Sequence, residues 1–145
     1  MHNIFHEQAK RLELLFSETD AVYHEATLKL GLTDSSMIVL YTICLFDGTC
    51  PLGDIATLSG LPKQTVNSAL RKLEGEDILY LEAVGGRKKR VCLTEKGREL
   101  CRDTVLRLMR MEDEVYASWP PEDLEKYLSL TQRFLNDFRE KVKEL

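Results

Sequence analysis

The chain has 145 residues, the length of one domain that can bury a core but cannot hold two large ones. Its hydrophobic fraction of 43% and charged fraction of 30% are typical of a soluble globular protein, and no apolar run approaches the length of a membrane span. The first residues mix acids and bases with apolar positions, unlike a secretion signal, so a cytoplasmic location is expected.

The net charge of −4 is distributed unevenly. Residues 62–98 hold nine Lys or Arg against five acids, a balance of +4, whereas the rest of the chain holds eleven bases against nineteen acids, a balance of −8. A basic centre between acidic flanks favours a polyanionic partner for the centre and a different task for the ends.

The N-terminal third of the chain predicts two helices. Apolar residues at spacings of three, four or seven form one stripe of a long amphipathic helix that ends at Gly31. Thr33 is a candidate N-cap for a second, mostly buried helix, with Asp34 in its first turn and the apolar run 37–46 behind it. Asp47-Gly48 closes this helix.

The next segment is typical of a helix-turn-helix. Pro51 opens a short third helix that stops at Ser59-Gly60, and a fourth helix starts after Pro62. The apolar face of this fourth helix is formed by Val66, Ala69, Leu70 and Leu73. Its opposite face is polar or cationic and carries Lys63, Gln64, Thr65, Asn67, Ser68, Arg71 and Lys72.

A β-hairpin is predicted after Gly75. The stretch "ILYLEAV" alternates and is rich in strand formers, Gly85-Gly86 can take the positive φ of a tight turn, and "RVCLT" returns as a second strand. The basic run Arg87, Lys88, Lys89 and Arg90 therefore lies at the tip of the hairpin.

Two helices are predicted to complete the chain. Thr94 caps a fifth helix that runs to about Trp119, where Pro120-Pro121 must break it. A sixth helix follows to the C-terminus, with an apolar stripe from Leu124 to Leu145. The predicted fold is mainly α with a small β-hairpin wing (α+β): a winged helix-turn-helix.

This order of elements predicts binding to duplex DNA. A polar helix of this kind fits the major groove, while the hairpin tip reaches the minor groove or the backbone. Taken alone, a polar helix face or a basic loop can equally be a solvated surface, and RKKR can also be a nuclear import signal. The combination of a polar helix face and a basic hairpin tip in one segment favours DNA binding over a solvated surface. The predicted contacts are Lys63, Gln64, Thr65, Asn67, Ser68, Arg71, Lys72, Arg87, Lys88, Lys89 and Arg90.

The chain resembles the MarR family of bacterial transcription regulators. The matching stretches are "GLTDSSMIVL", "LGDIATLSGLPKQTVNSALRKLEGEDIL" and "GGRKKRVCLTEKG", which ends in the family's L-T-x-x-G. The family's wing carries Asp-x-Arg; this chain keeps the arginine as Arg87 but has Gly85 in place of the aspartate.

The resemblance implies a homodimeric regulator, most often a repressor, that reads an inverted-repeat operator. Residues 33–98 would form the DNA-binding domain, and residues 1–32 and 99–145 the helical dimerisation region. Apolar stripes on both terminal helices independently favour a second copy of the chain as partner, because large exposed apolar patches are rare on monomers. The resemblance also implies that a ligand or an oxidant often controls release from DNA, and that a small-molecule pocket lies where the first, second and fifth helices meet. Tyr23, Tyr41 and Met109 are the candidate residues there, with core packing as the alternative for each.

The sequence gives little support for an enzyme, a cofactor site, a metal site or reactive cysteines. No cofactor is expected, and no catalytic triad, phosphate loop or metal-ligand cluster indicates an enzyme. His2 and His6 are four residues apart and could hold a metal, but a frayed first turn is the alternative. Four cysteines without a C-x-x-C pair are expected to be reduced and structural. The competing functions are a winged-helix protein-interaction module and a thiol- or metal-responsive regulator of the same fold.

Overall fold

The computed structural model describes residues 4–145 and forms two compact units, the first up to Leu108 and the second from Met109 to Leu145. The elements in chain order are α1 (Ile4–Lys29), α2 (Asp34–Cys44), β1 (Thr49–Pro51), α3 (Leu52–Ser59), α4 (Lys63–Gly75), β2 (Leu79–Gly85), β3 (Lys88–Leu93), α5 (Glu95–Asp103), α6 (Val105–Ala117) and α7 (Pro121–Val142). The mainly helical winged fold predicted from the sequence is confirmed.

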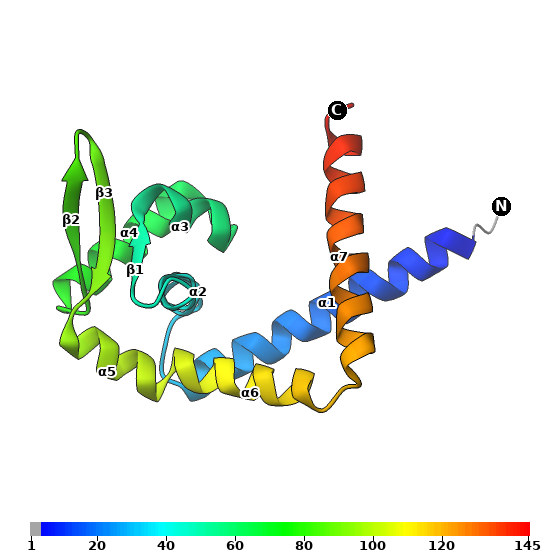
Figure 1. Cartoon of the computed structure of the whole chain (residues 1–145), viewed down its shortest axis with the longest axis horizontal. Coiled ribbons are helices and arrows are strands. Elements are labelled where there is room, and N and C mark those ends of the chain that lie inside the picture. Colours follow the sequence, from blue (N-terminus) through cyan, green and yellow to red (C-terminus); the bar gives the residue numbers. More distant parts are fainter. Residues whose placement is uncertain (1–3) are drawn as a thin grey trace. The chain divides into compact units, whose positions relative to one another are not determined.

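The core of the first unit lies between α2, α3, α4 and the sheet, with the β2–β3 hairpin beside the helices (Figure 1). Its largest fully buried side chains come from every one of these elements, and they include Leu40, Ile43, Ile55, Leu73, Leu79 and Val91. The winged segment therefore has its own continuous apolar core.

The wing is a three-stranded antiparallel sheet with the order β1-β3-β2, whereas the sequence predicted two strands. The additional strand β1 pairs with β3 through Thr49↔Cys92 and Cys50↔Val91. The sequence did not predict this strand because it has only three residues and ends in a proline. Proline lacks the backbone N–H donor and is rare in strands. β1 anchors the base of the hairpin to the start of α3.

Two predicted helix caps are confirmed. The Thr33 hydroxyl accepts a hydrogen bond from the Ser36 amide at 3.2 Å, and the Thr94 hydroxyl accepts one from the Gly97 amide at 2.9 Å. Thr94 also donates to the carbonyl of Asp77 at 2.6 Å, which ties the start of α5 to the start of the hairpin.

The sequence predicted one continuous fifth helix up to about Trp119. This prediction is wrong, because the helix is divided at Thr104. This residue has φ −127° and ψ −88°, outside the helical region, and separates α5 from α6. Its buried hydroxyl donates to the Leu100 carbonyl at 2.7 Å and so competes with the regular helical bonding. The predicted break at Pro120-Pro121 is present, with α7 beginning at Pro121.

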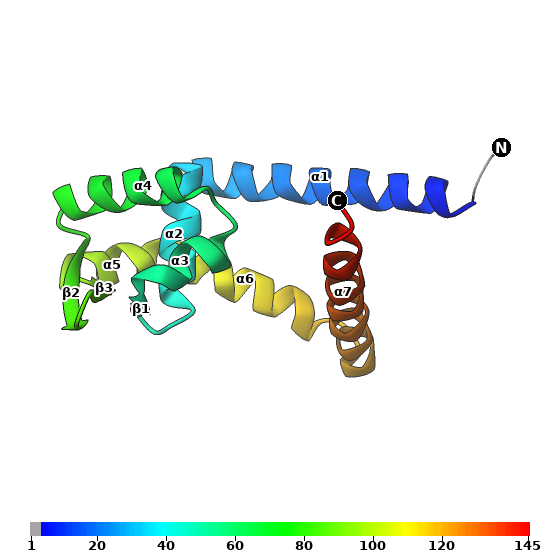
Figure 2. The ribbon, with the colours of Figure 1, turned by 90° about the horizontal axis from the view of Figure 1, so that it is seen from above.

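The terminal helices expose apolar side chains. Along most of α1, which projects away from the α2–α4 cluster (Figure 2), residues such as Leu12 and Phe16 are about half exposed. In α7 no residue is buried, and Phe134 and Phe138 stack on each other with 63% and 55% of their surfaces exposed. Among residues 4–145, no helix has the length and apolarity needed to cross a membrane.

Candidate nucleic-acid interface

Helix α4 divides its residues into a buried face and a free face. Val66, Ala69, Leu70 and Leu73 are at most 5% exposed and fix the helix against the core. The residues predicted to contact DNA lie on the other side: Lys63, Gln64, Asn67, Ser68, Arg71 and Lys72 are exposed, and Thr65 is half-buried. The sequence prediction that the polar face is available for a partner therefore agrees with the packing.

The start of α4 is electropositive for two reasons. Pro62 precedes the helix and offers no side-chain cap, so the first-turn amides keep unused donors. In addition, no carboxylate of residues 4–145 forms an ion pair with Lys63, Arg71 or Lys72. This end of α4 is suited to anionic oxygens.

The tip of the wing is built by the glycine pair. Gly85 and Gly86 have φ values of 120° and 57°, which favour glycine; Gly85 pairs with Lys88 at the end of β2, and the turn itself consists of Gly86 and Arg87, one residue later than the sequence predicted. The turn places Arg87 at the tip and Lys88 and Lys89 at the start of β3, all exposed. Within the described part of the chain, no carboxylate pairs with these three cations.

Arg90 differs from the other three cations of the basic run. Its Nε and Nη2 atoms each lie 3.0 Å from Oε2 of Glu82, directly across the hairpin. Hydrogen bonds with this carboxylate raise the pKa of Arg90. The same carboxylate oxygen accepts a hydrogen bond from the Cys92 thiol at 3.4 Å. Arg90 therefore has a partner that neutralises it at the base of the wing, a contact that the sequence analysis missed.

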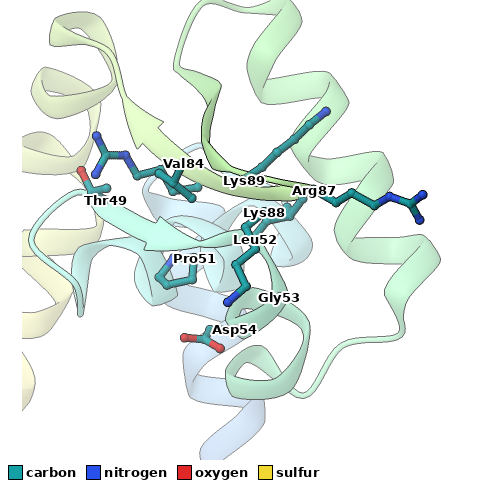
Figure 3. A pocket seen from close by; sticks show the side chains of 10 residues that line it. Thr49, Pro51, Leu52, Gly53, Asp54, Val84, Arg87, Lys88 and Lys89 are labelled. Carbon is teal, nitrogen blue, oxygen red and sulfur yellow. The ribbon is translucent and has the colours of Figure 1, made fainter.

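A hollow of about 770 Å³ lies between the wing and the start of α3. On one side it is lined by Thr49, Pro51, Leu52, Gly53 and Asp54, and on the other by Val84 and the run from Arg87 to Arg90. Lys88 extends across it toward the start of α3, whereas Arg87 and Lys89 extend away from it (Figure 3). The free cations of the wing thus point in several directions around the tip.

The predicted effector pocket and the predicted metal site are not formed by any contact between described residues. Tyr23 and Tyr41 belong to the first unit and Met109 to the second, so their shared effector pocket stays a prediction. His2 lies outside the described residues. Residues 4–145 contain no group of three or more side chains that could hold a metal ion.

Comparisons with known proteins agree with the resemblance to the MarR family. A family model described as MarR family matches residues 30–90. No curated protein matches the chain in sequence. The structure of NMB1585, a MarR family regulator from Neisseria meningitidis, is similar with a TM-score of 0.80 and 20% identity, and the match covers 99% of both chains.

Two further solved structures relate the fold to DNA binding in other proteins. The MepR–DNA complex of S. aureus is similar with a TM-score of 0.68 and 18% identity, over 90% of this chain and 96% of that one. Bordetella bronchiseptica BpsR, whose DNA binding is regulated by 6-hydroxynicotinic acid, is similar with a TM-score of 0.66 and 19% identity, over 88% and 98%. At these identities the similarity establishes the fold. The family match over residues 30–90 and the fold shared over the whole chain confirm the resemblance inferred from the sequence: residues 30–90 match the MarR family model, and the chain has the fold of solved MarR family regulators.

Proposed function

We propose that the protein is a homodimeric transcription regulator that binds duplex DNA at a palindromic operator and acts as a repressor by occupying it. The observation that carries the proposal is the separation of roles on α4. Its apolar face is held in the core, while its polar face and uncapped start are exposed beside a wing with three cations that no carboxylate of residues 4–145 pairs with.

Each part of this surface suits a part of the duplex. An α-helix fits the major groove, where the amides of Gln64 and Asn67 can bond base edges. Lys63, Arg71 and the start of α4 are better suited to phosphates, which fix position and carry no sequence information. The exposed wing cations extend the contact to the neighbouring groove or backbone.

The unburied apolar faces of α1 and α7 support the proposed dimer. Leu12 and Phe16 on α1, and Phe134 and Phe138 on α7, expose roughly half or more of their surface. A second copy that covers these two faces removes their apolar surface from water. Burial of apolar surface is the dominant favourable contribution to the free energy of association. A two-fold axis then places the two α4 helices about 34 Å apart, one turn of DNA, and makes the site an inverted repeat.

Selection of bound duplexes from a random pool tests the proposal. We expect an inverted repeat with half-sites about one turn apart, bound in a strongly salt-dependent way. With 6–10 phosphate contacts, the affinity should fall by about 10³–10⁵ between roughly 50 and 200 mM salt.

A matched control uses the same protein with both Gln64→Ala and Asn67→Ala. This variant should retain the salt-dependent binding to any duplex but lose the preference for the selected sequence. Recovery of no sequence from the pool, together with a flat salt response, would favour the protein-interaction module instead.

A further inference from the structure

Three aromatic side chains meet at the corner between α6 and α7, all of them within the second unit. Tyr116 lies in the last turn of α6, Trp119 in the short linker, and Tyr127 in the second turn of α7. The Trp119 ring meets the Tyr116 ring edge to face, with centroids 5.3 Å apart, and the Tyr127 ring in the same way at 5.7 Å. One indole therefore bridges two helices where the chain changes direction (Figure 1).

Trp119 is the only tryptophan of the chain, and its contacts differ from those of the phenylalanines on α7. It is 36% exposed, whereas Phe134 and Phe138 are 63% and 55% exposed. The two phenylalanines stack one turn apart within the same helix, so their contact joins no second element. Edge-to-face rings attract each other through their quadrupoles and prefer a defined geometry. The contacts of Trp119 can therefore fix the orientation of one helix relative to another.

The backbone of the corner has little freedom of its own. Pro120 has φ −56° and ψ 137°, and Pro121 follows as the first residue of α7. Proline fixes φ near −65° and restricts the residue before it to extended conformations. The Trp119 amide donates to the Tyr116 carbonyl at 3.1 Å, and the Asp123 amide donates to the Pro120 carbonyl at 2.9 Å. Few torsions of the linker remain variable, so one bridging ring is sufficient to fix them.

The direction of α7 depends on this corner because the core does not hold the helix. No residue of α7 is buried, and Leu124, in its first turn, is the one residue of α7 that is half-buried. A flexible corner would let the apolar face of α7 point in many directions. Association with a second copy would then have to order the helix, at a cost in free energy.

We propose that Trp119 is a positioning residue for dimer assembly. Its ring, held between Tyr116 and Tyr127, fixes the angle between α6 and α7 and so presents the apolar face of α7 in one direction. A preorganised face loses less conformational entropy on association, so the same apolar contacts give a tighter dimer. The inference rests on the proposed dimer and adds the residue that prepares the chain for it.

The distance between spin labels on the two helices, measured by pulsed dipolar electron paramagnetic resonance, tests the angle directly. The labels are attached through Glu114→Cys on α6 and Glu140→Cys on α7, both at exposed positions. Cys44 is replaced by serine in this background because it is the one cysteine that is not buried. An excess of unlabelled chain ensures that each measured distance lies within one chain. We expect a narrow distance distribution.

Three variants of the labelled chain test the rings. Trp119→Ala should broaden the distribution because no ring then bridges the corner. Trp119→Phe keeps an aromatic ring and should restore most of the narrow distribution. Tyr127→Leu keeps apolar bulk but removes the ring on the α7 side, so it should broaden the distribution and decides the proposal if Trp119→Ala fails to fold. Equal widths in the parent and these variants would overturn the proposal.

Ser118→Ala is the matched control in the same linker. The Ser118 hydroxyl donates to the Val115 carbonyl at 2.6 Å, a local contact that does not reach α7. This variant should keep both the narrow distribution and the dimer dissociation constant of the parent. Broadening equal to that of Trp119→Ala would show that the linker backbone, and not the indole, fixes the angle.

Sedimentation velocity of the unlabelled variants tests the consequence for assembly. The dimer dissociation constant should rise about tenfold for Trp119→Ala and less than about threefold for Trp119→Phe. A broadened distribution with an unchanged dissociation constant would overturn the positioning role. A parent chain that stays monomeric but shows the narrow distribution would refute the proposed dimer while confirming the angle that Trp119 fixes, so the two failures are distinguishable.

Discussion

The winged segment and the terminal helices of this chain distribute apolar surface in opposite ways. In α4 the apolar residues are buried and the polar residues are free, whereas in α7 no residue is buried and the phenylalanines face solvent. The first pattern belongs to an element that is complete within one chain and offers its polar face to a partner. The second belongs to an element that still lacks a covering surface. This difference supports the two proposed partners, DNA for the polar face of α4 and a second copy of the chain for the apolar face of α7.

The largest expected effect comes from placing charge on the apolar face of α7. Combined replacement Phe134→Asp and Phe138→Asp should raise the dimer dissociation constant at least about a hundredfold, since losing buried aromatic anchors costs ~2 kcal/mol or more each. Sedimentation velocity over a range of concentrations measures this. Binding to the selected duplex should weaken in parallel, because a monomer holds only one half-site.

The control for this variant is Asn136→Asp, which adds one negative charge on the opposite side of α7. Asn136 is exposed, and its amide oxygen accepts a hydrogen bond from Gln132, one turn earlier. This variant should remain dimeric. Equal dissociation of both variants would show that charge, and not the apolar face, controls assembly.

Gly97→Ala should destabilise the winged segment itself. A Cβ at Gly97 would collide with the carbonyl oxygen of Ile78, so α5 must move away from the hairpin. We expect a loss of about 2–4 kcal/mol in the free energy of unfolding, as for other overpacked or strained sites. Urea denaturation measures it. Gly75→Ala, which has no atom within 4 Å of the added carbon, should show no such loss.

Substitutions at the tip of the wing should affect DNA and leave the fold intact. Arg87→Ala should weaken binding by about 1–3 kcal/mol if it contacts base edges. Lys89→Ala should weaken binding to all duplexes alike and reduce the salt slope by about one. Fluorescence anisotropy with selected and scrambled duplexes separates the two roles, and unchanged affinity in both variants would exclude the wing from the interface.

The smallest expected effect is at Glu82. Glu82→Gln removes the charge that Arg90 pairs with, and because both side chains are 42% exposed the free energy of unfolding should fall only slightly. Arg90 then becomes a free cation, so binding to any duplex should be slightly tighter and more salt-dependent. Weaker binding with an unchanged fold would instead mean that the pair orients Arg90 for DNA.

Most of the fold could be predicted because its signals are local. Apolar periodicity marked α1 and α4, Thr33 and Thr94 marked helix starts, and Gly85-Gly86 marked the turn. The polar face of α4 could also be predicted, since a helix that buries four apolar positions must expose the others. These features depend on residues close together in the chain.

The contacts that were missed depend on distant residues or on irregular backbone. The β-bulge between Ala83 and Gly85 shifts the hairpin register by one residue, so counting from the turn would place Val91, and not Arg90, opposite Glu82. The pairing of β1 with β3 joins Thr49 to Cys92. No spacing rule connects positions so far apart.

The most direct test of the central claim, that two copies of α4 read one duplex, is the stoichiometry and spacing of binding. Sedimentation equilibrium should give two chains on a duplex that carries both half-sites. Inserting about five base pairs, half a turn of DNA, between them should weaken binding by at least about tenfold because the two helices can no longer face both half-sites. One chain per duplex, or equal affinity for both spacings, would contradict the account.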